Sequence, residues 1–243
     1  MFRDSMVWHG HEINQAIRYF VQLESQDHKI EKAYCLEGNS IDNTWNTLEF
    51  YKDKCSFPVD LHKQETSYPK VVSIADPKRI KSMSVLGDAL LDWVQSDLDT
   101  KVITKEKYDY ILWLESDLLI TYDLISRLVA SVAWLEIPLV VAPLIYVQNT
   151  ENFYDIWGFR GTNGKCWGSN PKEANTGLIE MQSVGSCVLF SASLLDKGLA
   201  FGTNGFVSFC STARDLGATI FANTDVRIWH PKSIDHPIKG RLV

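Results

Sequence analysis

The chain has 243 residues, of which 45% are hydrophobic and 12% aromatic, and it carries a formal net charge of −6. This composition predicts one compact domain with a sizeable core, and the acidic balance argues against nucleic acid as a partner, because nucleic-acid-binding surfaces are usually basic. The five cysteines are widely spaced without a CxxC pair, the N-terminus lacks a signal-peptide pattern, and no segment approaches the roughly 18 apolar residues of a membrane span, so we expect a cytoplasmic protein with reduced thiols.

Helical and strand periodicities alternate along the first 147 residues. Residues 10–27, for example, place apolar side chains on one stripe of an amphipathic helix. The expected order is helix 10–27, strand 29–36, a helix from about 42 to 50, strand 69–76, helix 80–94, strand 108–117, helix 124–132 and strand 138–147. Such alternation predicts an α/β fold with a mostly parallel sheet flanked by helices.

From residue 148 onward the chain is richer in Asn, Gly, Trp and charged residues. The segment 151–168 suits a loop that covers a polar, ring-shaped ligand, with a purely structural loop as the alternative. A strand is expected over 179–191, where Gly185 allows a close backbone approach. The remaining expected elements are a helix over 206–216 and short strands at 219–221 and 226–229.

The strand at 108–117 is apolar on both faces and ends in two carboxylates. Alternation places Glu115 and Asp117 on one face and Ser116 on the other. Because open α/β sheets bind ligands at the carboxyl ends of their strands, the two acids are candidate ligands for Mg²⁺ or Mn²⁺. A turn with solvated acids is the alternative.

Two further polar features follow predicted strands. Glu37 opens a Glu-Gly-Asn-Ser turn, and His230 follows the last strand. In a doubly wound sheet these features and the acidic pair lie on one rim, where a carboxylate pair, an imidazole and diphosphate oxygens form a plausible metal shell. A capped turn or a surface histidine is the alternative. The sequence contains no P-loop, no GxGxxG after the first strand and no GxSxG elbow.

These features together resemble glycosyltransferases of the GT-A fold, in which a DxD-type acidic motif ends a central strand and a histidine comes late in the chain. Glu115-Ser116-Asp117 and His230 are similar to these two features. Four other patches resemble fungal mannan- and capsule-type mannosyltransferases, namely Phe2-Arg-Asp-Ser5, Leu36-Glu-Gly-Asn-Ser-Ile-Asp42, Phe153-Tyr-Asp-Ile-Trp-Gly-Phe-Arg160 and Val184-Gly-Ser-Cys-Val-Leu-Phe190.

The resemblance implies a single GT-A domain with a nucleotide-sugar-binding half, 1–147, and a mixed acceptor-binding half, 148–243. It further implies that a hexose, such as mannose, moves from a GDP- or UDP-sugar to a glycan or glycoprotein acceptor. Two departures stand out. The chain begins at the end of the family's first strand, and Asn204 to Ser208 lacks the acid that serves inverting members as general base.

The resemblance also implies roles for single residues. Glu115, Asp117 and His230 hold the metal, and Asp155 and Arg160 are the catalytic or acceptor-side candidates. The residues expected around the nucleotide are Arg3, Glu37, Asp42, Arg79, Lys81 and Ser116. Asp155 is the best remaining base if the reaction inverts, although we favour retention. A non-catalytic nucleotide- or sugar-binding module and a sugar nucleotidyltransferase are the alternative functions.

Overall fold

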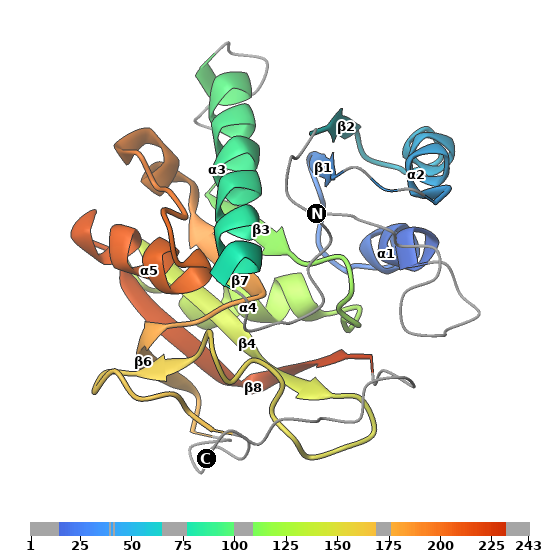
Figure 1. Cartoon of the computed structure of the whole chain (residues 1–243). Helices are drawn as coiled ribbons and strands as arrows, with labels where there is room; N and C mark the ends of the chain where they lie inside the picture. The colour runs from blue at the N-terminus through green and yellow to red at the C-terminus, as the bar shows by residue number, and fades with distance from the viewer. Residues whose placement is uncertain are drawn as a thin grey trace.

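The computed structural model of the protein describes residues 15–38, 40, 42–64, 77–99, 109–168 and 176–231. Its centre is a six-stranded mixed sheet with the strand order β3-β7-β4-β8-β6-β5 (Figure 1). The strands are β3 (Tyr110–Leu114), β4 (Leu139–Val147), β5 (Arg160–Gly161), β6 (Leu178–Ser183), β7 (Cys187–Ser191) and β8 (Thr219–His230). β4 is parallel to β8, and β7 is antiparallel to both β3 and β4. β3, β4 and β8 therefore run in the same direction and end at the same rim.

Two further strands form a separate parallel pair. β1 (Ala33–Glu37) pairs with β2 (Val59–Lys63) in register from Ala33 opposite Val59 to Glu37 opposite Lys63. In Figure 1 this pair stands between β3 and the first two helices, α1 (Gln15–Glu24) and α2 (Thr44–Lys52).

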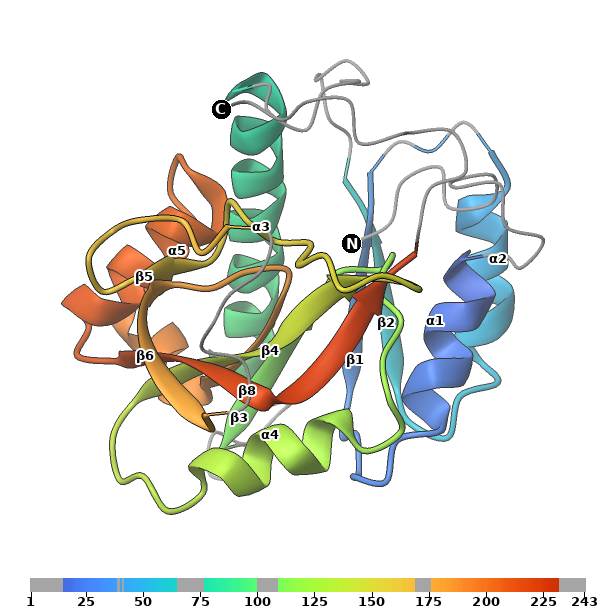
Figure 2. The ribbon, with the colours of Figure 1, turned by 90° about the horizontal axis from the view of Figure 1, so that it is seen from below.

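Helices cover both faces of the central sheet (Figure 2). One face packs against α3 (Pro77–Asp99) and α5 (Gly205–Asp215), and the other packs against α1 and α4 (Leu124–Val132). Alternation along β4 explains the two cores. Val140, Ala142 and Leu144 belong to the first core, while Leu139, Val141 and Ile145 belong to the second. None of the described helices is both long and apolar enough to cross a membrane.

The α/β, Rossmann-like class that the sequence predicts is confirmed, with a mixed rather than a mostly parallel pairing in the central sheet. The strand predicted over 179–191 is two strands, β6 and β7, because Ser186 takes a left-handed backbone conformation with φ of 58° between them. The sequence did not predict β2, which is short and largely polar. The strand expected over 69–76 lies outside the described residues.

The two short strands predicted near the C-terminus are one long strand, β8, interrupted by a bulge. The register moves from Pro143 opposite Asn223 to Leu144 opposite Arg227, so Thr224, Asp225 and Val226 have no counterpart on β4. After the bulge β8 continues to His230, beside the end of β4 at Val147.

Candidate functional site at the rim of the sheet

The loop that follows β3 crosses the rim from β7 to β8 and is held at both ends. The Glu115 amide donates to the carbonyl of Ser186 (3.1 Å). Leu119 and Trp229 exchange two backbone hydrogen bonds of 2.7 and 2.9 Å. Asp117 lies between these two anchor points. The structure therefore brings the acidic motif to the end of β8, as the sequence predicts.

Asp117 and His230 are in direct contact. The distance from His230 Nε2 to Asp117 Oδ2 is 3.1 Å, and His230 Nδ1 lies 2.8 Å from the carbonyl oxygen of Pro231. Because a carbonyl oxygen only accepts, Nδ1 carries the proton and donates it. A neutral imidazole then presents the lone pair of Nε2 to the carboxylate. The contact consequently requires a cation between the two atoms, either a proton or a metal ion.

The chemistry of this pair fits a divalent ion that is shared with a ligand. Adjacent ligands of an octahedral ion with bonds of about 2.1 Å lie about 3 Å apart, which is close to the Nε2–Oδ2 distance. A metal-bound histidine usually donates its other ring N–H, as Nδ1 does here. The described residues contain no group of three or more His, Cys, Asp or Glu side chains arranged to hold a metal. Any ion here therefore needs oxygen ligands from a bound molecule.

Tyr154 fixes the plane of the imidazole. Its ring stacks on His230 with centroids 3.9 Å apart and an interplanar angle of 10°. The Tyr154 amide donates to the carbonyl of Ile145 on β4 (2.8 Å), which sets the position of the ring above the strand. Burial, and after it the charges of Asp117 and Glu115, raise the pKa of Tyr154, so the phenol stays neutral beside the acids.

Asp155 lies in a close-fitting cradle of backbone and hydroxyl donors. Its Oδ2 accepts from the Ser186 hydroxyl (2.8 Å) and its Oδ1 accepts from the Gly158 amide (3.1 Å). A Cβ on Gly158 or on Gly185 would lie only 2.7 Å from a carboxylate oxygen of Asp155. The close backbone approach that the sequence predicts at Gly185 is therefore confirmed, and its neighbour is Asp155.

Most aromatic side chains of the 151–168 loop are part of the core. Phe153 and Phe159 are 3% and 0% exposed, and Phe153 packs edge-on against Phe159 with centroids 5.0 Å apart. Trp167 packs against both rings. These contacts fix the loop on either side of Asp155, as the structural alternative predicted. Trp157, 52% exposed, is the exception and faces solvent.

The acids at the rim perturb one another. Burial, followed by the charges of Asp117 and Asp155, raises the pKa of Glu115 to about 8, and Arg79 opposes this rise. Burial also raises the pKa of Asp155, against its bonds from Ser186 and Gly158. Bringing three carboxyl groups together in a partly buried place is unfavourable unless protons or other cations balance them.

The free energy of unfolding should fall as the pH rises from about 5 to about 8. Glu115 binds a proton more tightly in the folded chain than in the unfolded chain, so the folded form binds more protons between about pH 5 and pH 8, and the free energy of unfolding decreases over that interval. We expect Glu115→Gln to reduce this decrease by roughly 1 to 3 kcal/mol, measured by urea unfolding at pH 5.5 and pH 8. The exposed Glu136→Gln is the control, and an unchanged decrease in Glu115→Gln would contradict the assignment.

The sequence did not identify three residues that face this site. These are Tyr154, Ser186 and Arg18, the last on α1. Burial lowers the pKa of the Arg18 guanidinium while the charge of Asp117 raises it, so the two groups lie within electrostatic range. Arg18 occupies a partly buried position within the amphipathic helix that the sequence predicts. The one sequence signal for Arg18 is that a positively charged residue lies beside the apolar stripe of the predicted helix.

The other predicted residues have different surroundings. Arg79 is partly buried and interacts electrostatically with Glu115, whereas Lys81 is exposed because it lies on another side of α3. Arg160 donates to the carbonyl of Gly164 in its own loop (3.4 Å). Ser116 is buried, at 7% exposure. Arg3 lies outside the described residues.

The two acids expected at the nucleotide base stabilise their own turn. Glu37 is fully buried, and its Oε1 accepts from the Ser40 amide (2.6 Å). Asp42 accepts from the amide and the hydroxyl of Thr44 at the start of α2. The other Glu37 oxygen, Oε2, is buried without a hydrogen bond to any described residue.

Similar structures are known, although no protein-family model and no curated protein sequence matches the chain. S. aureus TarS 1–349 in complex with UDP-GlcNAc superposes with a TM-score of 0.53 at 15% identity, over 90% of this chain and 56% of that one. Its complex with UDP gives 0.54 at 14% identity, over 90% and 58%. A longer TarS structure gives 0.55 at 12% identity, over 90% and 34%.

The chain thus spans little more than half the length of TarS 1–349. The fungal mannosyltransferases that the sequence patches resemble are not among these structures, so that part of the resemblance stays a prediction. At this level of identity the likeness concerns the fold, and it shows that the chain has the GT-A type of α/β fold.

Proposed function

We propose that the chain is a glycosyltransferase domain that moves a hexose from a nucleoside-diphosphate sugar to a glycan or glycoprotein acceptor with the help of Mn²⁺ or Mg²⁺. The observation that carries the proposal is the pair of Asp117 and His230, 3.1 Å apart, at the rim of a GT-A type sheet. Structures of similar fold contain UDP or UDP-GlcNAc, which supports a nucleotide sugar, with a UDP- or GDP-sugar such as GDP-mannose as candidate donor.

In this proposal Asp117 and His230 would hold the ion together with diphosphate oxygens, whereas Glu115, which forms no three-ligand group with them, would add negative charge nearby. When bound, such an ion would supply positive charge to the diphosphate leaving group. Two arginines add positive charge near this proposed ion site. Arg79 interacts with Glu115, and Arg18 interacts with Asp117. Tyr154 keeps the imidazole plane fixed, so the ligand geometry is present before the donor binds.

Asp155 is the chain's candidate for contact with the reacting sugar or the acceptor hydroxyl. Its cradle of Ser186, Gly158 and Gly185 holds the carboxylate in one orientation, which is what a positioned catalytic group requires. Its raised pKa moves it toward the range in which a carboxylate can exchange a proton at neutral pH. Glu37 and Asp42 remain the proposed base- or ribose-side residues, with Arg3 and Lys81 bordering the nucleotide.

The test is release of nucleoside diphosphate from UDP-GlcNAc, UDP-glucose and GDP-mannose, with Mn²⁺, with Mg²⁺ and with EDTA. We expect release from at least one donor with a divalent ion, and its loss with EDTA. Saturable UDP binding without turnover of any donor would indicate the non-catalytic module. Formation of a nucleotide sugar from a nucleoside triphosphate and a sugar phosphate would indicate a nucleotidyltransferase.

A further inference from the structure

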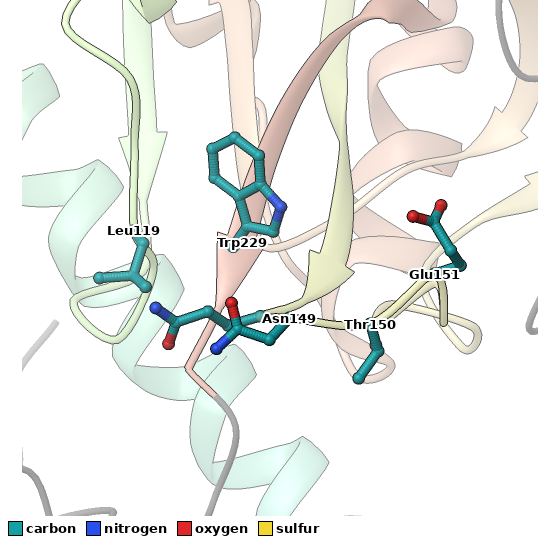
Figure 3. Close-up of a pocket in the computed structure, with 6 residues that line it drawn as sticks. Leu119, Asn149, Thr150, Glu151 and Trp229 are labelled. Carbon is teal, nitrogen blue, oxygen red and sulfur yellow. The ribbon is translucent and has the colours of Figure 1, made fainter.

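A pocket of about 520 Å³ lies beyond the ends of β4 and β8 (Figure 3). The described residues that line it are Leu119, Gln148, Asn149, Thr150, Glu151 and Trp229. Binding pockets for small molecules usually measure about 300 to 1,000 Å³, so this one is large enough for a monosaccharide unit. None of the residues placed at the metal or at the nucleotide lines it.

The polar groups of the pocket are available for a ligand. The Thr150 hydroxyl donates to the carbonyl of Val147 (2.8 Å) and belongs to the turn. By contrast, the side chains of Gln148, Asn149 and Glu151 form no hydrogen bond within the described part of the chain. Figure 3 shows Trp229 above the turn that carries Asn149 and Glu151, with its indole extending along β8, where it packs partly against the first core. The pocket thus combines one aromatic face with amide and carboxylate groups.

This combination matches a pyranose ring better than a nucleotide. The C–H bonds on one face of a sugar ring carry slight positive charge, which suits the negative face of an indole. Sugar hydroxyls both donate and accept, so they pair with amides and with a carboxylate. No Lys or Arg lines the pocket among the described residues, and Glu151 would repel a phosphate. The chemistry therefore favours a neutral sugar.

The pocket adjoins the candidate site on the side away from the nucleotide. The Gln148 amide donates to the carbonyl of His230 (2.8 Å), and Trp229 precedes His230 on the same strand. Neighbouring residues of a strand face opposite ways, so Trp229 opens to the pocket while His230 contacts Asp117. The turn at Glu37, where the nucleotide base is expected, ends β1 on the other side of β3 (Figure 1).

We propose that this pocket binds a neutral sugar ring of the acceptor, with Trp229 as the stacking surface and Asn149 and Glu151 as hydrogen-bonding groups. The acceptor role rests on the proposed function, whereas sugar binding itself does not. An acceptor held here lies beside the Asp117–His230 pair.

Three substitutions test the pocket. Asn149→Gly removes the amide side chain without backbone strain, because Asn149 already has a φ of 61°. Glu151→Gln removes a charge at an exposed position, and Trp229→Leu removes the aromatic face. Glu136→Gln and Trp134→Leu are the matched controls, since both residues are exposed and precede β4 at its opposite end.

The probes are the methyl glycosides of glucose, galactose, mannose and N-acetylglucosamine, followed by saturation-transfer NMR. We expect wild-type protein and both controls to transfer magnetisation to at least one glycoside. Asn149→Gly and Glu151→Gln should weaken that signal about threefold or more, and Trp229→Leu should abolish it. UDP binding, measured by calorimetry, should stay within about twofold of wild type in all five variants.

The possible outcomes separate the two proposals. If no glycoside binds wild-type protein, or if the three pocket variants bind as wild type does, the sugar pocket is wrong even where UDP binds. A second outcome is that wild-type protein binds glycosides, the pocket variants bind them more weakly, and UDP and every donor fail to bind. In that case the sugar pocket is supported and the transferase assignment fails. Loss of glycoside binding in the controls as well would place the sugar elsewhere and overturn the pocket.

Discussion

Asp117→Asn is expected to lower turnover of the nucleotide sugar by about 10²- to 10³-fold while leaving the protein at least as stable as wild type. The loss follows because an amide oxygen is a much weaker ligand than a carboxylate for a hard divalent ion. The unchanged or raised stability follows from the contact with His230. An Asn side chain can donate its N–H to the lone pair of Nε2, where the carboxylate of Asp117 offers only another acceptor.

The measurements are diphosphate release at saturating Mn²⁺ and the midpoint of thermal unfolding without metal. Asp109→Asn is the matched control, since Asp109 is exposed at the opposite end of β3. Turnover within about threefold of wild type would remove Asp117 from the catalytic machinery. A large drop in melting temperature would instead assign the residue a structural role.

Asp155→Asn is expected to lower turnover by about 10²- to 10⁴-fold, the usual range for removing a positioned general acid or base. The folded structure should persist. Asn keeps an oxygen to accept from the Gly158 amide, and its N–H₂ group can donate to the Ser186 hydroxyl, which also accepts. The substitution thus changes the charge and leaves the shape of the cradle intact.

Ser186→Ala tests whether the Ser186 hydroxyl orients the Asp155 carboxylate for the reaction. Removing the hydroxyl takes away one of the two donors that orient the carboxylate, so a smaller fall in turnover is expected, together with a shift of the pH–rate profile toward higher pH. Asp225→Asn, on the β8 bulge, is the control for Asp155→Asn. If Asp155→Asn keeps wild-type turnover at every pH, the cradle serves only to anchor the 154–159 loop.

The rim of the sheet was predictable because its strands carry strong signals. β3 and β4 are continuous apolar runs, so their ends are visible in the sequence, and strands that run in one direction deliver their ends to one edge. Glu115, Asp117 and His230 share that edge for this reason. Their prediction needed the direction of the strands and no knowledge of side-chain packing.

The contacts around Asp155 and the position of Arg18 near Asp117 were harder to predict from the sequence, since they depend on packing between distant segments. Ser186 donates to Asp155 because residue 186 takes a left-handed conformation, which a serine in the sequence does not indicate. Arg18 reaches Asp117 only through the packing of α1 on the sheet. That packing includes Gln22, whose side chain bonds to the carbonyl of Leu118 and the amide of Ile120.

Arg160 and Lys81 have surroundings that their charge alone does not indicate. Arg160 lies in the antiparallel pair of β5 and β6 and donates to the carbonyl of Gly164 in its own loop. Lys81 follows Arg79 by two positions on α3, and a helix turns about 200° over that distance. Only one of the two side chains can face Glu115.

The bulge in β8 determines how the length of this chain can vary in evolution or be changed by design. Before it, Ile220 and Ala222 face the core under α3 and α5; after it, Val226 and Ile228 face the core under α1 and α4. The even-numbered positions thus change sides at the bulge. Removal of all three unpaired residues would place Asn223 next to Arg227, as Pro143 is next to Leu144, and would keep Trp229 and His230 on their present faces. Length changes upstream of the histidine should therefore be tolerated within the bulge.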